Sequence, residues 1–357
     1  MATHSTTLFQ PATLVLQDGT RIEARSFGAH QARVGELVFT TGMVGYPQSL
    51  TDPSYRGQIM VCTYPIIGSY GVPDKSAWES DEIQASAIIV STYHYEPSSA
   101  YSTQPLHEWL QAQNVCGLEV VDTRLLAIKL RDGGAQLAKI VFDKQDEQRL
   151  QWDDPNLRNM VAEVSPKQVE YYGKKGAKTI VYIDCGGKRE ILYNFLRRGV
   201  RVIRVPWNYD IFSLPEKFDG VFVSNGPGDP KIVKETIKTI QKVIAAKIPT
   251  FGICLGNQLL ALAAGGDTYK LKFGHRSQNQ PCVMSGTKRC YMTTQNHGFA
   301  VGKVPAGFET WFFNANDQTC EGIKHKKLPI FSVQFHPEST PGPEDTTWLF
   351  DEFISHI

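Results

Sequence analysis

Apolar residues follow two different patterns in the two halves of this chain. In the first half they form short alternating runs that are interrupted by glycine and proline, at 12–16, 36–40, 59–63 and 84–91. Alternation of this kind predicts half-buried strands. Two amphipathic stretches, near 106–113 and 124–131, predict helices. We therefore expect a β-rich α+β domain over the first 140 residues or so.

From Lys178 onward, predicted strands alternate with predicted helices. The expected strands are 179–183, 200–205, 220–224 and 247–253, and the expected helices are 189–198, 232–244 and 255–264. This order favours a doubly wound, mostly parallel sheet with helices on both faces. In such sheets, sites form beyond the carboxyl ends of the strands. The fold class is thus α/β in the second half, with the β-rich domain before it.

A polar connector over residues 144 to 177 separates the two patterns. A chain of 357 residues has room for two domains, and we place them at 1–150 and 177–357. Lys and Arg number 37 against 36 Asp and Glu, so no charge bias points to nucleic acid or an acidic membrane as a partner. No apolar run reaches the roughly 20 residues of a membrane span. Residues 1–7 lack a signal core and predict a short disordered lead.

One of the seven cysteines stands out from the others. None lies in a C-x-x-C pair and no histidine cluster has metal-ligand spacing, so we predict reduced thiols, a cytoplasmic location and no metal site. Cys254, however, lies between a predicted strand and a predicted helix, with Gly252 and Gly256 on either side. Such a sharp turn places the sulfur at a helix N-terminus, where unpaired N–H groups favour an anion. This arrangement predicts a nucleophile.

Residues that could assist this nucleophile follow other strands of the same half. His336 comes directly after the apolar run 331–335, and Glu338 two residues later could fix the imidazole tautomer. The N–H of Leu255 and the tight loop around Gly226 could stabilise an oxyanion. Each motif alone has an ordinary interpretation as a turn; together they predict a Cys-His-Glu triad for acyl transfer.

Three ordered motifs, at 224–230, 252–258 and 335–338, resemble the triad-type, class I glutamine amidotransferases. The resemblance implies hydrolysis of the glutamine side-chain amide through a cysteinyl thioester, with the ammonia passing to a synthase partner. In this interpretation Cys254 is the nucleophile, His336 the base and Glu338 the carboxylate that orients the base.

The first half is similar to the N-terminal domain of the carbamoyl phosphate synthetase small subunit, in a eukaryotic-like version. The segments that carry this likeness are 35–39, 42–47, 50–55, 63–71 and 121–124, with 295–300 in the second half. The family pattern implies that a further set of residues binds glutamine or its oxyanion: Ser54, Gly226, Gly228, Leu255, Gln258, Asn296, Gly298 and Phe299. It also implies a large subunit, or fused synthetase domains, that would hold ATP, bicarbonate and magnesium. The chain itself has no P-loop, and we expect no cofactor in it.

The sequence departs from the family pattern at three positions. Asn257 replaces the usual histidine, which predicts altered glutamine binding, and Glu190 and Tyr193 replace the usual asparagine and arginine. These departures keep open a non-catalytic, glutamine-binding regulatory subunit. An amidotransferase for another synthase, such as anthranilate or GMP synthase, is a second alternative. The residues do not distinguish pyrimidine from arginine synthesis, nor a separate subunit from a fused domain.

Overall fold

The computed structural model describes residues 8–175 and 178–357, and these divide into two compact units, Met1–Pro155 and Asn156–Ile357. The predicted disordered lead, residues 1–7, lies outside the described residues. The second unit begins before the expected position 177, inside the polar connector. The reason is β8 (Glu170–Tyr172), which pairs antiparallel with β10 (Arg201–Pro206) and so belongs to the second sheet.

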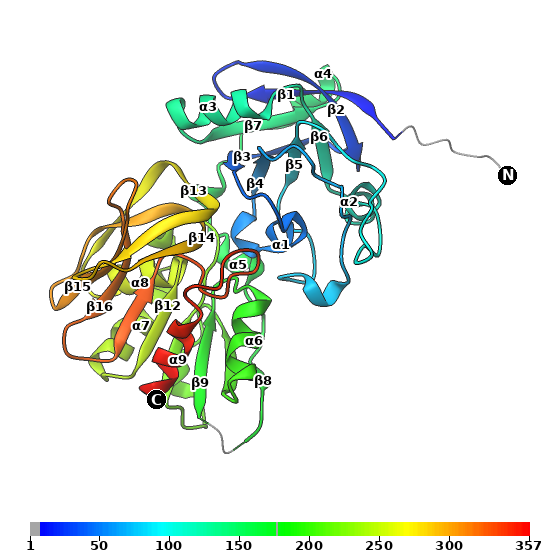
Figure 1. Ribbon diagram of the computed structural model, residues 1–357. Coiled ribbons are helices and arrows are strands. Elements are labelled where there is room, and N and C mark those ends of the chain that lie inside the picture. The colour runs from blue at the N-terminus through cyan, green and yellow to red at the C-terminus, as the bar shows by residue number, and fades with distance from the viewer. Residues whose placement is uncertain (1–7, 176–177) are drawn as a thin grey trace. The chain divides into compact units, whose positions relative to one another are not determined.

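The first unit is built on a closed barrel with the strand order β1-β2-β6-β5-β4-β3-β7 (Figure 1). The strands are β1 (Gln10–Leu16), β2 (Arg21–Gly28), β3 (Arg33–Thr40), β4 (Gln58–Cys62), β5 (Ala87–Val90), β6 (Cys116–Glu119) and β7 (Gln136–Val141). The helices are α1 (Tyr46–Thr51), α2 (Leu106–Ala112), α3 (Thr123–Gly133) and α4 (Lys144–Arg149). The four predicted strands correspond to β1, β3, β4 and β5, and the two predicted helices to α2 and α3.

Successive residues of the barrel strands belong to two different apolar clusters. Met60 and Ile88 pack with the residues of α1 and α2, whereas Ile59, Val61 and Ile89 pack with those of α3. This follows from the two-residue period of a strand, which sends neighbouring side chains to opposite faces. Both faces of β4 and β5 are therefore buried.

The second unit contains a ten-stranded sheet with the order β14-β13-β15-β16-β17-β12-β11-β9-β10-β8 among the described residues. Its strands not yet given are β9 (Thr179–Asp184), β11 (Gly220–Val223), β12 (Thr250–Ile253), β13 (Asp267–Met284), β14 (Cys290–Lys303), β15 (Phe308–Asn314), β16 (Cys320–His325) and β17 (Ile330–Val333). The five strands from β17 to β10 are parallel, which confirms the expected fold class. The antiparallel extension from β13 to β16 goes beyond the prediction.

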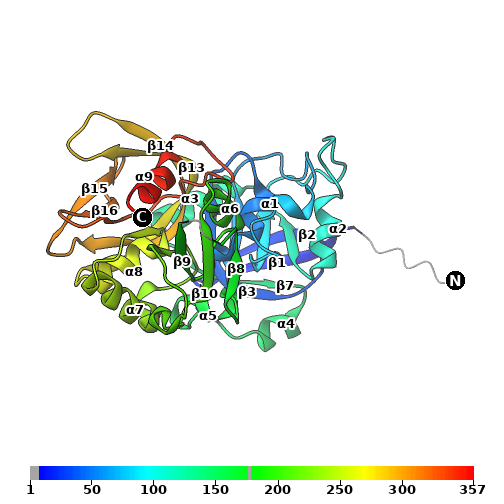
Figure 2. The same cartoon turned by 90° about the horizontal axis from the view of Figure 1, so that it is seen from below.

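Helices cover both faces of the parallel strands: α5 (Val161–Val164), α6 (Arg189–Arg197), α7 (Lys234–Ala245), α8 (Leu255–Ala263) and α9 (Trp348–Ser355). Figure 2 shows α7 and α8 on one side of β9 and β10, with α6 and α9 on the other. The strands supply alternate residues to the two sides. Val181 and Ile183 lie in the cluster of α7 and α8, whereas Ile180 and Tyr182 lie in the cluster of α6 and α9. Two-sided burial explains the nearly continuous apolar runs in these strands.

Two further features concern the state of the cysteines and the length of the apolar helices. All seven cysteines are free thiols. In the part of the chain that the structure describes, no helix is long and apolar enough to cross a membrane.

Candidate active site

The predicted nucleophile and base emerge at the same edge of the second sheet. Strands β12 and β17 are parallel neighbours, with Ile253 paired to Val333 at their last residues. Cys254 therefore leaves β12 beside the segment that follows β17, and its N–H donates to the Val333 carbonyl at 2.8 Å. Strands β11 and β9 are the next neighbours of β12, so the loops that follow them reach the same edge.

Cys254 is held in a backbone conformation that L-residues rarely adopt. It is the N-cap of α8, with φ 54° and ψ −101°. The turn is possible because its neighbours lack side chains: a Cβ on Gly256 would lie 2.2 Å from the Val223 carbonyl oxygen, and one on Gly252 would lie 2.8 Å from Gly256. The strand-to-helix turn thus has the geometry of a nucleophile elbow, with the thiol at a helix N-terminus.

His336 and Glu338 form a buried pair beside this thiol. Nδ1 of His336 lies 2.7 Å from Oε1 of Glu338, and the His336 backbone N–H donates to Thr294 at 2.9 Å. Burial alone would lower the pKa of His336, but the Glu338 carboxylate and the Cys254 sulfur raise it to about 10. Nε2 of His336 makes no hydrogen bond to any described residue. Glu338 therefore fixes the ring through Nδ1, and Nε2 can donate a proton to a molecule that reacts with Cys254.

Lys188, which no motif in the sequence marks, completes the charge arrangement. Its Nζ donates to Oε1 of Glu338 at 2.9 Å and to the Thr340 carbonyl, and its side chain is only 3% exposed. Burial raises the pKa of Glu338, but Lys188 and His336 together lower it to about 2. The only sequence signal is a lysine in the polar loop directly after a buried strand, which is too common to single out.

The proposed oxyanion positions lie close together. A Cβ on Gly226 would meet the Cys185 carbonyl at 2.1 Å and the Leu255 side chain at 2.9 Å, so the loop after β11 passes close to the start of α8. Gly228 has φ +85°, which favours glycine. Backbone without side-chain cover is what an oxyanion site requires.

The predicted glutamine-binding residues of β14 also adjoin Cys254. The Cys254 thiol lies 3.7 Å from the Asn296 carbonyl oxygen, and Nε2 of Gln258 donates to the Phe299 carbonyl at 2.7 Å. Gln258 thus ties α8 to the backbone of β14. Gly298 lies between Asn296 and Phe299 in the sequence, and a Cβ there would be 3.3 Å from the Arg276 guanidinium. The eighth predicted residue, Ser54, belongs to the first unit, where its N–H donates to the Asp52 carboxylate at 2.9 Å.

Asn257, the departure nearest to the nucleophile, faces into the protein interior. Its Oδ1 accepts from Ser332 at 2.9 Å and its Nδ2 donates to Oε1 of Gln334 at 3.2 Å. Glu190 bonds to Asn194 within α6, and Tyr193 on the same helix is partly exposed. Asn257 therefore helps to connect α8 to β17 and the segment that follows it.

The fold and the site define the chain's class. A strained cysteine at a helix start and a His-Glu pair lie at the carboxyl edge of a doubly wound sheet. Residues 181–356 match the family model described as glutamine amidotransferase class-I. Residues 14–140 match the model of the carbamoyl-phosphate synthase small chain, CPSase domain.

Relatives narrow this class to one family. The chain is 45% identical to the carbamoyl phosphate synthase small chain of Pyrococcus furiosus, and the match covers 96% of each. It is 47% identical to the multifunctional protein CAD of Squalus acanthias, covering 96% of this chain but 16% of that protein. The chain belongs to the carbamoyl phosphate synthase small-chain family.

The chain spans about a sixth of the length of its multifunctional relatives, 17% in the case of pyr1-3 of Dictyostelium discoideum. Among solved structures, a glutamine amidotransferase from Thermotoga maritima is similar over 45% of this chain and 76% of its own, with 17% identity and a TM-score of 0.39.

Proposed function

We propose that this chain is the glutamine-hydrolysing component of a carbamoyl phosphate synthetase. The observation that supports this most strongly is that the strained Cys254 lies beside a buried histidine–carboxylate pair. In that pair, Nδ1 of His336 is 2.7 Å from Oε1 of Glu338. Family membership supports the substrate, glutamine, and the fate of the ammonia.

In the proposed reaction, the Cys254 thiolate attacks the carboxamide carbon of glutamine. The resulting oxyanion accepts hydrogen bonds from backbone N–H groups near Gly226 and Leu255. His336, protonated at Nε2, donates that proton to the nitrogen as the C–N bond breaks, which releases ammonia and leaves a thioester. His336 then removes a proton from water, the water oxygen attacks the thioester, and the C–S bond breaks to give glutamate. Glu338 and Lys188 hold the imidazole in place throughout.

The partner in this proposal is a synthetase large subunit or a set of fused synthetase domains. Two kinds of relative support it: a small chain of nearly the same length, and multifunctional proteins of which this chain matches a small part. ATP, bicarbonate and magnesium would bind to that partner, and no cofactor is needed for the thioester chemistry here. The chain would act in the cytoplasm, where the free state of its seven cysteines is maintained.

Two measurements on the purified chain and its synthetase test the proposal. Cys254→Ser should abolish ammonia release from glutamine while the circular dichroism spectrum stays unchanged. A glutamine analogue with an electrophilic side chain should label the unmutated chain once, at Cys254. Cys290, which is exposed, provides the control, and Cys290→Ser should label as before. Glutamine hydrolysis by Cys254→Ser would overturn the assignment of Cys254 as the nucleophile. Tight glutamine binding without labelling would instead indicate a regulatory subunit.

A further inference from the structure

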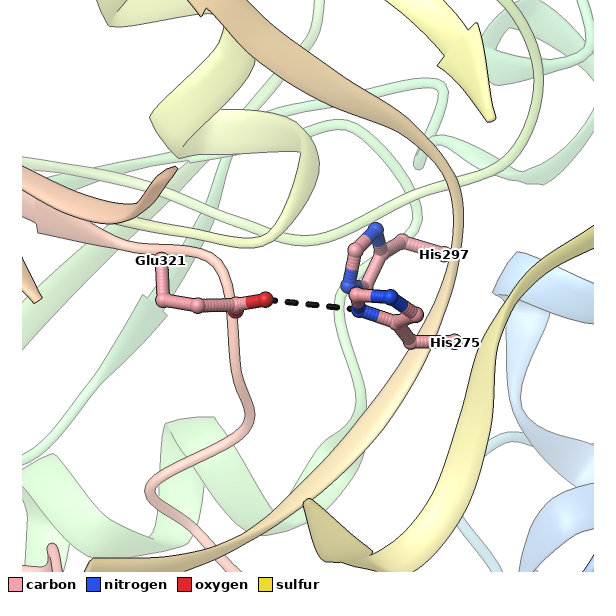
Figure 3. Close-up of side chains that lie close together, drawn as sticks. All are labelled: His275, His297 and Glu321. Atoms are coloured by element: carbon pink, nitrogen blue, oxygen red, sulfur yellow. Dashed lines mark ion pairs between the residues drawn. The ribbon is translucent and has the colours of Figure 1, made fainter. Parts of the chain in front are cut away.

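Three buried side chains from three different strands converge in the second unit, apart from the triad. They are His275 on β13, His297 on β14 and Glu321 on β16, and one potential ligand atom from each lies within 4.8 Å of the other two (Figure 3). Nδ1 of His275 is 3.3 Å from Oε1 of Glu321. Two imidazoles and a carboxylate are a common set of ligands for a transition metal ion.

Each ring has an inner nitrogen that faces the other side chains of the cluster, Nδ1 in His275 and Nε2 in His297. These two inner nitrogens contact the same acceptor. Oε1 of Gln295 lies 2.9 Å from Nδ1 of His275 and 3.0 Å from Nε2 of His297. The Gln295 amide nitrogen points elsewhere and donates to Oε2 of Glu321 at 3.0 Å. That bond fixes the orientation of the amide, so its oxygen is the atom presented to the two rings.

The outer nitrogens of both rings also face acceptors. Nε2 of His275 lies 2.8 Å from the Asp317 carboxylate, and Nδ1 of His297 lies 2.9 Å from the Phe299 carbonyl. A neutral imidazole has one proton, and it can donate to the outer acceptor only if that proton is on the outer nitrogen. The inner nitrogen then has no proton, and its lone pair points at a lone pair of the Gln295 amide oxygen. A cation between these atoms would turn the repulsion into attraction.

The outer contacts are those that metal-binding histidines usually make. Such a ring donates its second N–H to a carboxylate or a backbone carbonyl, which fixes its orientation and tautomer. His275 does the first and His297 does the second.

We propose that His275, His297 and Glu321, with the amide oxygen of Gln295, form a four-coordinate site for a divalent transition metal ion. Zinc fits best, because it accepts imidazole and carboxylate ligands in tetrahedral geometry. With zinc–ligand bonds of about 2.0–2.1 Å, tetrahedral ligands lie about 3.3 Å apart. The separation between His275 and Glu321 already has this value. Gln295 would move outward by a few tenths of an ångström from its 2.9 and 3.0 Å contacts, and His297, whose ligand atom lies within 4.8 Å of the other two, would move inward when the ion binds.

The ion would be structural, since four protein atoms fill its coordination and no position is left for a substrate. It would join β13, β14 and β16 next to Asn296, whose carbonyl contacts the Cys254 thiol. The competing occupant is a second proton on His275, which would let the ring donate hydrogen bonds to both the Asp317 and the Glu321 carboxylates. The site is independent of the proposed glutaminase activity.

The experiment uses the full chain, dialysed against a chelator, in a Cys254→Ser background so that the triad cannot bind the metal. Titration with Zn²⁺ by calorimetry should show one ion per chain and a raised melting temperature. Co²⁺ should give the intense visible absorption of a tetrahedral complex.

Substitutions then assign the ligands. His297→Gln and Glu321→Gln should each abolish stoichiometric binding, and Asp317→Asn, which changes only an outer contact, should weaken it roughly 10- to 100-fold. His325→Gln is the control, because His325 lies on the same strand as Glu321 but bonds to Lys327 and Leu328. If a ligand variant does not fold, the Zn²⁺ and Co²⁺ titrations of the parent chain still decide. Absence of stoichiometric binding by the parent, or unchanged binding in the folded ligand variants, would overturn the proposal.

Discussion

Replacing Glu338 by glutamine removes the one negative charge that lies between two buried cations. Oε1 of Glu338 is 2.7 Å from Nδ1 of His336 and 2.9 Å from Nζ of Lys188, and its side chain has no exposure to solvent. The pKa of Glu338 falls from 4.5 to about 2 in the folded protein. A difference of this size corresponds to about 3 kcal/mol of favourable interaction with the ionised carboxylate. The loss of one partner from a buried ion pair costs a similar amount, roughly 3–5 kcal/mol.

A double-mutant cycle separates the energy of the Lys188–Glu338 ion pair from simple packing effects. We expect Glu338→Gln and Lys188→Met each to lower the free energy of unfolding by about 3 kcal/mol, because the first leaves the buried Lys188 without its carboxylate and the second leaves the buried Glu338 with only one of its two cations. The double variant has no unpaired charge at this position and should lose at least 2 kcal/mol less than the sum of the two. Urea denaturation of the three variants, followed by tryptophan fluorescence and by circular dichroism, measures these differences.

The same variants should separate stability from catalysis. The double variant recovers stability, but its His336 lacks the carboxylate that raises the imidazole pKa, so glutaminase activity should stay low at every pH. Additive losses of stability, within about 0.5 kcal/mol, would show that the two residues do not interact as their 2.9 Å contact implies. Full activity in the double variant would refute the role given to Glu338.

The remaining predictions concern pH and two further positions. Because the pKa of His336 is raised from 6.5 to about 10, its protonated form should persist through neutral pH, and glutaminase kcat/KM should decline only as the pH rises through about 10. The stability that this proton contributes is complete below about pH 6.5 and should be lost progressively up to about pH 10; a loss of activity or stability already complete at pH 8 would contradict this. Gly256→Ala should lose most activity, because its Cβ would lie 2.2 Å from a backbone oxygen, whereas Gly133→Ala, with nothing within 4 Å, should be neutral or stabilising by up to about 1 kcal/mol in thermal unfolding. Asn257→Ala should lower the free energy of unfolding by about 1–3 kcal/mol through the bonds lost to Ser332 and Gln334, and an unchanged urea midpoint would show that these bonds are unimportant.

Some features of the fold follow from local sequence alone. The four predicted strands of the barrel and the alternation of strands and helices after Lys178 are visible because each element buries its own apolar face. The missed strands have other patterns. Strand β2 (Arg21–Gly28) is largely polar, and the long strands β13 and β14 contain charged and amide residues that become buried only through their neighbours. Their burial is a property of the sheet and cannot be seen in the segment.

The sequence by itself determined the nucleophile turn and the spacing of His336 and Glu338, because glycines around a cysteine and a two-residue interval are local constraints. Tertiary structure alone brought Lys188 to Glu338, which is 150 residues away in the chain. It also brought His275 and His297 to Glu321, since these come from separate strands of one sheet. Buried charges and imidazoles need partners, and long-range strand pairing decides which partners they find.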